Sequence, residues 1–481
     1  MILPDIYQTP IKAISPPKPP FLGGVLLLHG YGGSKEIMQS LAIDLALEGF
    51  YTFSLDLPGC GDSNRSFTRK ELLPAINSAY ENLLGRALLT PGKIAILGHS
   101  MGGGLALQFA REHPEVQATV LLSSVPGEVT ADAPRNLLLL TAENDLPGLK
   151  QAASRMLQAS FPGKTVSKGI TVGEFASGTA RRAIEVPGVN HLTVLYSSLV
   201  SRESREWIRQ ALRPGMAANT IPSLSGGLAA LLAVALCLFV PLVVVAVYFA
   251  APGAERLGFR NLHPKRDGLI LSAVCLAACL IAAFLPARPW IPIHMVDYVA
   301  TACAIAGTAI TVSAYCLGVR LSWDLPPWRL LTRPAILAVG SFLFLYWNIG
   351  LEVNSYWLRM ALSGGRWEIA ARVALLLAPL IFFQELVSRE LLQRRGFWRS
   401  YLVSALMNTV LLAGLLVPAL LRLGNIDAFL LLMSAPFLAA FFLFIPLLSA
   451  WLFRVSHSVL LSATWTTLVY AWLFTATPYW K

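Results

Sequence analysis

One serine stands in a pattern that could make its hydroxyl a nucleophile. Ser100 is the centre of Gly98-His99-Ser100-Met101-Gly102, which follows the apolar run KIAIL and precedes the helical pattern GGGLALQFARE. A sharp turn from strand to helix needs glycines around the serine, because neighbouring Cβ atoms would clash. Such a turn lifts the hydroxyl clear of the sheet and points the start of the helix at it. The pattern therefore predicts a nucleophilic serine rather than a serine that only caps a helix.

A nucleophilic serine needs a general base, and the order of the histidines favours one candidate. In this arrangement the acid and the histidine follow the serine in the chain. Of seven histidines, only His113 and His191 follow Ser100 before the long apolar segments begin. His113 closes the helix that Ser100 opens, more than three turns away, and cannot reach back. His191 lies in VPGVNHL, a loop after the last predicted strand, and is the predicted base.

The carboxylate that orients the base should lie between the serine and the histidine. The run LLLLTAEND carries Glu143 and Asp145 from a predicted strand into a loop. Asp145 is favoured because it lies in the loop. Asp132 precedes that strand and is expected to be solvated, while Asp56, in LDLPGCGDS, precedes the serine and is expected to support turns near the site. Asp145 is therefore the predicted acid.

A glycine-rich turn, Leu28-His29-Gly30-Tyr31-Gly32-Gly33, follows an earlier predicted strand. Its backbone can approach the serine, so the N–H groups of Tyr31 and Met101 are predicted to bind the oxyanion of a tetrahedral intermediate. His29 is expected to hold this loop. The six cysteines form no C-x-x-C pair, so neither a metal site nor a disulfide framework is predicted, and no cofactor is expected.

The elements that must position these residues alternate between β-rich and helical patterns up to about Leu212, as in a parallel sheet covered by helices. Residues 161–180 are expected to be loop. The predicted strands are Val25–Leu28, Tyr51–Leu55, Lys93–Leu97, Ala118–Ser123, Asn136–Thr141 and Arg181–Val186. The predicted helices are Lys35–Glu48, Pro74–Leu84, Gly102–Glu112, Gly148–Ala159 and Leu192–Ala211.

Five ordered motifs carry a family resemblance: LLLHGYGGSKE, LDLPGCGDS, ILGHSMGGGLAL, LLTAEND and VPGVNHL. They resemble the α/β-hydrolase superfamily, most closely its serine aminopeptidase S33 and monoacylglycerol-lipase-like branch, over roughly residues 23–212. The resemblance implies a Ser100–Asp145–His191 triad and an acyl-enzyme mechanism. The family often inserts a helical cap before the strand that starts here at Asn136, but only a dozen residues are available, so no cap domain is expected.

The sequence of the second half of the chain predicts a membrane domain. Residues 1–212 are predicted to form the hydrolase domain, 213–227 a linker and 228–481 a transmembrane helical domain. About eight apolar stretches follow the linker, each near the 20 residues that cross a bilayer. They are Leu228–Ala250, Gly268–Leu285, Tyr298–Val319, Ala335–Leu351, Ile369–Val387, Leu402–Leu421, Ala428–Phe453 and Val459–Thr477.

Two charged residues, Glu385 and Arg389, lie one helical turn apart within an apolar stretch, and they are predicted to pair beside Gln384. The pair could form a functional polar site or only fix helix packing. This stretch weakly resembles the CAAX-protease and bacteriocin-processing (CPBP) membrane family, with Gln384 replacing the first of two signature glutamates. The resemblance covers roughly residues 335–477 and implies that fold with a disabled metal-type site. The later signature positions hold other residues, namely Asn408, Leu412, Ser462 and Thr466.

The net charge of +11 belongs mostly to the second half, where arginine clusters between apolar stretches suit anionic lipid headgroups. The charge of the first half is nearly balanced, which argues against nucleic-acid binding.

The expected function is a membrane-tethered ester hydrolase acting on a lipid-like acyl substrate. The alternatives are a serine peptidase or thioesterase with the same triad, and a membrane transporter or scaffold with a regulatory hydrolase domain. The N-terminus lacks a secretory signal, so the hydrolase is expected in the cytoplasm.

Overall fold

The computed structural model describes residues 9–215, except 18–20, 64, 88 and 162–166. In the second half it describes 257–260, parts of 266–281, 291–293, 296–323, 327–351, 360–362, 365–392, 396–421 and 426–476. The chain divides into two compact units, one holding the described residues up to 215 and the other those from 257 onward. The first predicted apolar stretch, Leu228–Ala250, and most of the predicted linker lie outside the described residues.

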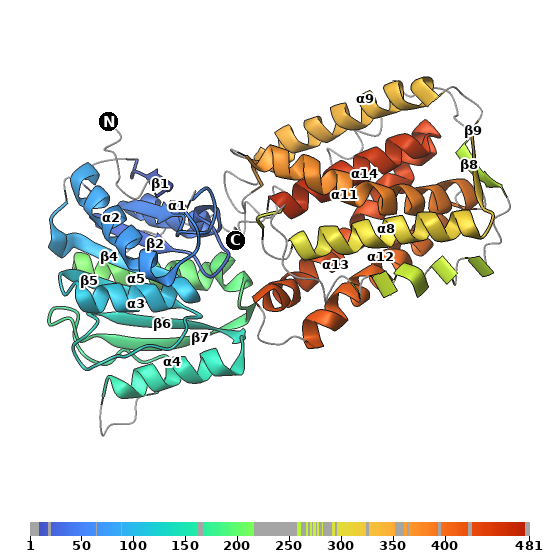
Figure 1. Ribbon diagram of the computed structural model, residues 1–481. Coiled ribbons are helices and arrows are strands. Elements are labelled where there is room, and N and C mark those ends of the chain that lie inside the picture. Colours follow the sequence, from blue (N-terminus) through green and yellow to red (C-terminus); the bar gives the residue numbers. More distant parts are fainter. Residues whose placement is uncertain are drawn as a thin grey trace. The chain divides into compact units, whose positions relative to one another are not determined.

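The first unit is built on a seven-stranded sheet in the order β1-β3-β2-β4-β5-β6-β7 (Figure 1). Only the edge strand β1 is antiparallel to its neighbour, and the other pairs are parallel. The strands are β1 Ile11–Ile14, β2 Gly23–Leu28, β3 Phe50–Leu55, β4 Ile94–His99, β5 Val116–Leu122, β6 Leu137–Asn144 and β7 Arg181–Asn190.

Helices cover both faces of this sheet. The core on one face contains side chains of α2, α3 and α4, and the core on the other contains those of α1 and α5. Two short 3-10 turns, η1 (Lys35–Met38) and η3 (Thr193–Tyr196), lead into α1 and α5. The helices are α1 Gln39–Glu48, α2 Arg69–Ala87, α3 Met101–Glu112, α4 Pro147–Ala159 and α5 Ser198–Leu212.

The observed sheet confirms the predicted α/β fold class with a mostly parallel sheet. All six predicted strands are present with shifted ends, and β1 was not predicted because it is short and only half-buried. Residues 123–136 connect β5 to β6 and contain no helix, so no cap domain is inserted at that point. Loops, and not an inserted domain, therefore form the surface at this point, beyond the carboxyl end of β5.

The second unit is helical, with one two-stranded antiparallel sheet in its described residues, in which β8 (Leu257–Arg260) pairs with β9 (Arg320–Trp323). The helices whose bounds are described in this unit are α8 Val296–Cys316, α9 Pro327–Leu345, α11 Arg366–Leu386, α12 Phe397–Leu421, α13 Ile426–Ser456 and α14 Val459–Thr475. Two π-helical turns, η4 (Tyr346–Gly350) and η5 (Val387–Leu392), extend α9 and α11.

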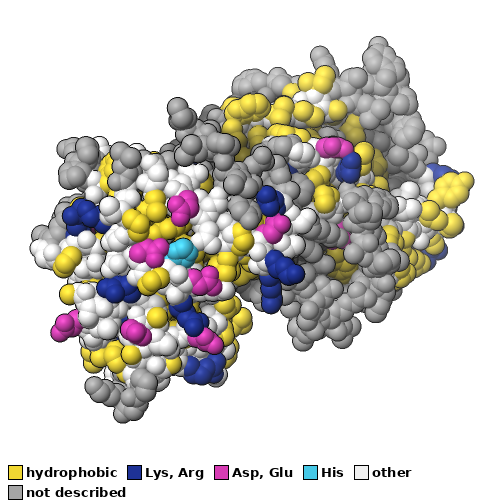
Figure 2. Space-filling model, turned by 60° about the vertical axis from the view of Figure 1, so that its left-hand side comes forward, with side chains coloured by type: hydrophobic (Ala, Val, Ile, Leu, Met, Phe, Trp, Pro, Cys, Tyr) yellow, Lys and Arg dark blue, Asp and Glu magenta, His cyan; other side chains and the backbone are white. Residues whose placement is uncertain are grey.

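Within the described residues, three helices are long and apolar enough to cross a membrane: Val296–Cys316, Arg366–Arg389 and Leu438–Ser456. Pro334–Leu345 and Val459–Thr475 are apolar but shorter. Eight spans therefore stay a prediction. Figure 2 shows hydrophobic side chains gathered on the described surface of this unit, whereas charged side chains of both signs are scattered over the α/β unit.

Candidate active site

Ser100 lies at a strained corner between β4 and α3. Its backbone has φ 54° and ψ −117°, a conformation that side chains other than glycine rarely adopt. A Cβ on Gly98 would lie 2.2 Å from the carbonyl oxygen of Gly102, and a Cβ on Gly102 would lie 2.4 Å from that of His29. The two glycines allow the close approach that the sequence pattern requires, and the corner presents Ser100 at the start of α3.

The structure brings Ser100 together with His191 and Asp145, although they come from three loops far apart in the sequence. The Oγ atom of Ser100 lies 3.0 Å from Nε2 of His191. The other ring nitrogen, Nδ1, lies 2.9 Å from Oδ1 of Asp145. These distances suit a chain of hydrogen bonds in which the hydroxyl donates to the imidazole and the imidazole donates to the carboxylate.

The other carboxylates near this edge have different partners. Glu143 points to the last residues of β7, where its Oε2 accepts a hydrogen bond of 2.7 Å from the backbone N–H of Gly188. Asp132 is exposed, and Thr130 donates a hydrogen bond to it. Of the carboxylates considered from the sequence, Asp145 is the one that contacts the imidazole of His191.

The surroundings of Asp145 favour its ionised form. Burial raises the pKa of this carboxyl, but the hydrogen bond to His191 and the nearby hydroxyl of Ser123 lower it by more, so its pKa lies below the ordinary value. The backbone N–H of Leu146 also donates to Oδ1 over 2.9 Å. The carboxylate can therefore accept a hydrogen bond from Nδ1–H and stabilise the imidazolium that forms when His191 takes a proton.

The glycine-rich turn after β2 runs directly against the serine corner. A Cβ on Gly30 would lie 3.0 Å from Cβ of Ser100, so the backbone leading to Tyr31 passes beside the nucleophile. The ring of Tyr31 packs edge-on against Phe67, with 5.2 Å between ring centroids. Met101 is the first residue of α3. The two residues predicted to supply oxyanion-binding N–H groups thus directly follow residues at the corner, Tyr31 after Gly30 and Met101 after Ser100.

The side chain of His29 stabilises the glycine-rich turn after β2 by hydrogen bonds. Its Nδ1 donates to the carbonyl of Gly30 over 2.7 Å, and its Nε2 accepts from the N–H of Leu57 over 3.0 Å. Burial lowers the pKa of His29 to about 4, so the imidazole is neutral at pH 7. The ring links the loops after β2 and β3, which is the supporting role expected from the sequence.

Asp56 supports the turns near the site, as expected from the sequence, and it does so by pairing with Lys35, which was not predicted. The carboxylate of Asp56 is fully buried and accepts from both the backbone N–H and the Nζ of Lys35, over 2.7 and 2.6 Å. Nζ also contacts Asp62 at 2.6 Å. These three carboxylate and ammonium groups join the start of η1 to the loop after β3. The sequence shows an Asp after a predicted strand and a Lys after a glycine-rich turn, but no local pattern indicates that these two side chains pair.

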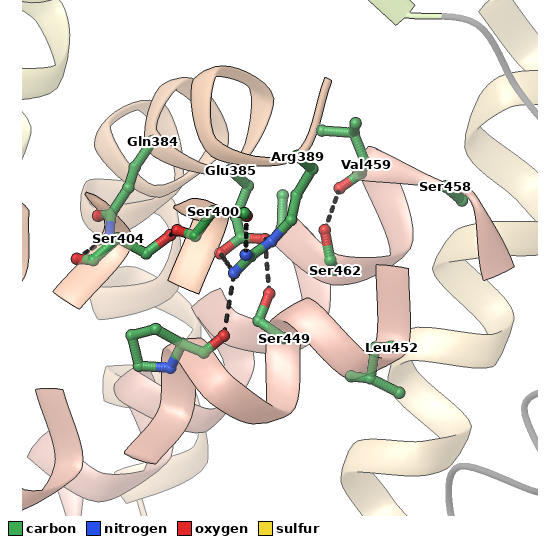
Figure 3. Close-up of polar contacts among 12 residues, drawn as sticks. Gln384, Glu385, Arg389, Ser400, Ser404, Ser449, Leu452, Ser458, Val459 and Ser462 are labelled. Atoms are coloured by element: carbon green, nitrogen blue, oxygen red, sulfur yellow. Dashed lines mark hydrogen bonds and ion pairs between the residues drawn. The ribbon is translucent and has the colours of Figure 1, made fainter. Parts of the chain in front are cut away.

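The helical unit contains a buried polar cluster, drawn in Figure 3. The predicted pair is confirmed: Nε of Arg389 lies 2.9 Å from Oε2 of Glu385. Arg389 also donates to Oγ of Ser400 over 2.7 Å and to the carbonyl of Pro446 over 3.1 Å, and Ser449 donates to Glu385 over 2.5 Å. The ion pair therefore joins the end of α11 to α12 and α13.

Gln384 makes a separate polar contact in the same unit. Its Nε2 donates to Oδ1 of Asn408 over 2.8 Å, and Nδ2 of Asn408 donates to the carbonyl of Phe442 over 2.9 Å and contacts the hydroxyl of Tyr470 at 3.2 Å. In the part of the chain that the structure describes, no group of three or more His, Cys, Asp or Glu residues is placed to hold a metal ion. The CPBP-like fold stays a prediction.

Comparisons with known proteins place the similarity in the first unit. The family described as alpha/beta hydrolase fold matches residues 24–167. Lipase 1 of Psychrobacter immobilis is 30% identical over 121 residues, which are 25% of this chain and 37% of that lipase. Lipase 3 of Moraxella sp. (strain TA144) is 29% identical over 121 residues, which are 25% of this chain and 38% of that lipase. The chain thus spans less than half the length of these curated relatives.

Among solved structures, the monoacylglycerol lipase of Paleococcus ferrophilus matches with a TM-score of 0.34 and 17% identity, over 42% of this chain and 99% of that protein. The family match and the observed strand order agree. The N-terminal unit of this chain has the α/β-hydrolase fold.

Proposed function

We propose that the chain is a membrane-tethered serine hydrolase that cleaves carboxylic esters of lipid-like acyl substrates. The observation that carries this proposal is the line of hydrogen bonds from Ser100 through His191 to Asp145. The likeness to two bacterial lipases favours esters over amides and thioesters. The apolar helices of the second unit favour a membrane-bound chain and a substrate that is itself found in the bilayer.

In the proposed mechanism, Nε2 of His191 takes the Ser100 proton as Oγ attacks the ester carbonyl carbon. The carbonyl oxygen becomes an oxyanion, which accepts hydrogen bonds from the N–H groups of Tyr31 and Met101. The ester bond then breaks, and the alcohol leaves with the proton from His191. Water attacks the acyl-enzyme and gives a proton to His191. The acyl–Oγ bond then breaks, His191 returns the proton to Oγ of Ser100, and the acid is released. Asp145 stabilises the imidazolium at each proton transfer.

A fluorophosphonate probe tests the nucleophile. The wild-type chain should be labelled, and Ser100→Ala should not, because the probe reacts with an activated serine hydroxyl. Ser124→Ala, which changes a buried serine close to the same helix, is the matched control and should be labelled. Labelling of Ser100→Ala at the wild-type rate would remove this serine from the mechanism.

The substrate class needs a second measurement. Purified chain in detergent is given acyl-glycerol esters and aminoacyl amides in parallel, and kcat/KM is compared. The proposal expects faster turnover of the esters. Faster turnover of the amides, lost in Ser100→Ala, would instead make the chain a serine peptidase.

A further inference from the structure

A second imidazole lies beside the proposed base and takes no part in the mechanism above. His99 immediately precedes Ser100 and is the last residue of β4. It is buried, with 2% of its surface exposed. Its ring lies against the ring of His191, with 4.9 Å between centroids and 44° between planes. The ring of His99 therefore contacts the proposed base, His191, and a peptide bond joins His99 to the proposed nucleophile, Ser100.

The hydrogen bond made by His99 fixes which nitrogen carries its proton. Nε2 lies 2.8 Å from the backbone carbonyl oxygen of His191, and a carbonyl can only accept. Nε2 must therefore carry the hydrogen. Nδ1 is buried and has no hydrogen-bond partner among the described residues. Burial lowers the pKa of His99 to about 3, so the ring stays neutral over the pH range in which enzymes usually work.

The same ring also limits the position of the glycine-rich turn. A Cβ on Gly30 would lie 2.8 Å from Nδ1 of His99, so the turn approaches the ring as closely as a glycine allows. The loops that carry Ser100, His191 and Tyr31 thus meet at one neutral imidazole. No other described contact ties the backbone of His191 to the serine corner by a hydrogen bond.

We infer that His99 is a positioning residue, whose Nε2–H holds the backbone of His191 so that its imidazole faces Ser100. This inference rests on the proposed function. Losing the hydrogen bond frees the loop that carries the base, and misplacing a catalytic group by about 1 Å costs up to about 100-fold in rate. The effect falls on proton transfer and not on binding of the probe or substrate.

Three substitutions separate the hydrogen bond from simple filling of space. His99→Gln places an amide N–H near the position of Nε2, His99→Asn carries the same amide one methylene shorter, and His99→Leu fills the space without a donor. For the fluorophosphonate probe, kinact should fall about 10- to 100-fold in the Leu and Asn variants with KI unchanged. The Gln variant should stay within about threefold of wild type. Rates are normalised to the folded fraction, measured by thermal unfolding.

The outcomes distinguish this inference from the proposed function. Labelling of the wild-type chain that does not require Ser100 would overturn both. Labelling that requires Ser100, with folded His99→Leu reacting at the wild-type rate, would overturn only the role of His99. An equal loss in the Gln, Asn and Leu variants would also overturn it, because the donor would then not be what matters.

Discussion

His29 makes the stability of the α/β unit depend on pH. Its pKa is about 4 in the folded chain and 6.5 when unperturbed, so between these values the unfolded chain binds more protons. The free energy of unfolding must therefore fall as pH is lowered from 6.5 towards 4, by about 3 kcal/mol over the whole range. His99, also buried and neutral, acts in the same direction.

This dependence can be measured by heating the full chain in detergent at pH 7, 6 and 5 and recording the loss of fluorophosphonate labelling. The comparison is His29→Leu, which removes the buried imidazole, so the melting temperature of this variant should change less between pH 7 and 5 than that of the wild type. A melting temperature that is flat between pH 7 and 5 would contradict the buried neutral state of His29.

Asp145 can be tested against its close neighbour Glu143. Asp145→Asn keeps the side-chain shape but no longer provides a carboxylate to accept the hydrogen of Nδ1 of His191, so the imidazole loses both its orientation and its charge partner. We expect kcat for a chromogenic ester to fall by roughly 10⁴, as when the triad carboxylate is replaced elsewhere. Glu143→Gln should leave kcat nearly unchanged. Equal losses in both variants would mean that Glu143 serves as the acid.

Among the elements, the strand-to-helix corner is the most sensitive to added volume. A Cβ on Gly102 would lie 2.4 and 2.5 Å from the carbonyl oxygens of His29 and Leu28. These are backbone atoms, which cannot move aside without an energetic cost. Gly102→Ala should lower the free energy of unfolding by about 1–3 kcal/mol. Gly85→Ala, in α2 with nothing within 4 Å, should raise it by about 0.5–1 kcal/mol. Denaturant unfolding of the two variants in detergent measures both, and similar stabilities would refute the clash.

The order of elements and the triad candidates could be predicted because they depend on local pattern and chain order. The glycines around Ser100 and the elimination of His113 needed no knowledge of distant contacts. The pairing of Lys35 with Asp56, the contact of His99 with His191, and the pairing of β8 with β9 were not predicted. Each joins residues far apart in the sequence, and no periodicity specifies which buried group will meet which.

The ion pair in the helical unit should stabilise packing only while both partners remain. Glu385→Ala leaves the Arg389 guanidinium buried without its carboxylate, which costs about 3–5 kcal/mol. Replacing both, as Glu385→Leu with Arg389→Met, removes the buried charge and should recover most of the loss. Melting of the full chain in detergent, followed by size-exclusion chromatography, compares them. A double variant as unstable as the single one would show that the cluster does more than pair two charges.

At the scale of the whole molecule, the described residues bring arginines from segments far apart in the sequence to one end of the helical unit. β8 pairs with β9, which brings Arg260 opposite Arg320, and β8 contacts η5. The guanidinium of Arg454 lies over the ring of Phe397 at the start of α12, next to Arg399. Arg260 and Arg320, from two segments far apart in the sequence, therefore lie opposite each other near η5, at one end of the helical unit. Basic loops favour the cytoplasmic face of a membrane.

Cys316, an exposed residue at the end of α8 beside β9, reports on which side this end lies. Because basic loops favour the cytoplasmic face, we expect a membrane-impermeant maleimide to label it only after cells are permeabilised, and this expectation departs from the cytoplasmic hydrolase expected from the N-terminal sequence. Cys316→Ser is the control for labelling of other thiols. Three predicted spans separate Cys316 from the hydrolase domain, and an odd number of crossings puts the two on opposite faces. Protection of Cys316 in intact cells would therefore place Ser100 outside the cytoplasm and overturn the placement expected from the N-terminal sequence. Labelling in intact cells would instead keep the hydrolase in the cytoplasm and show that the basic end does not set the orientation.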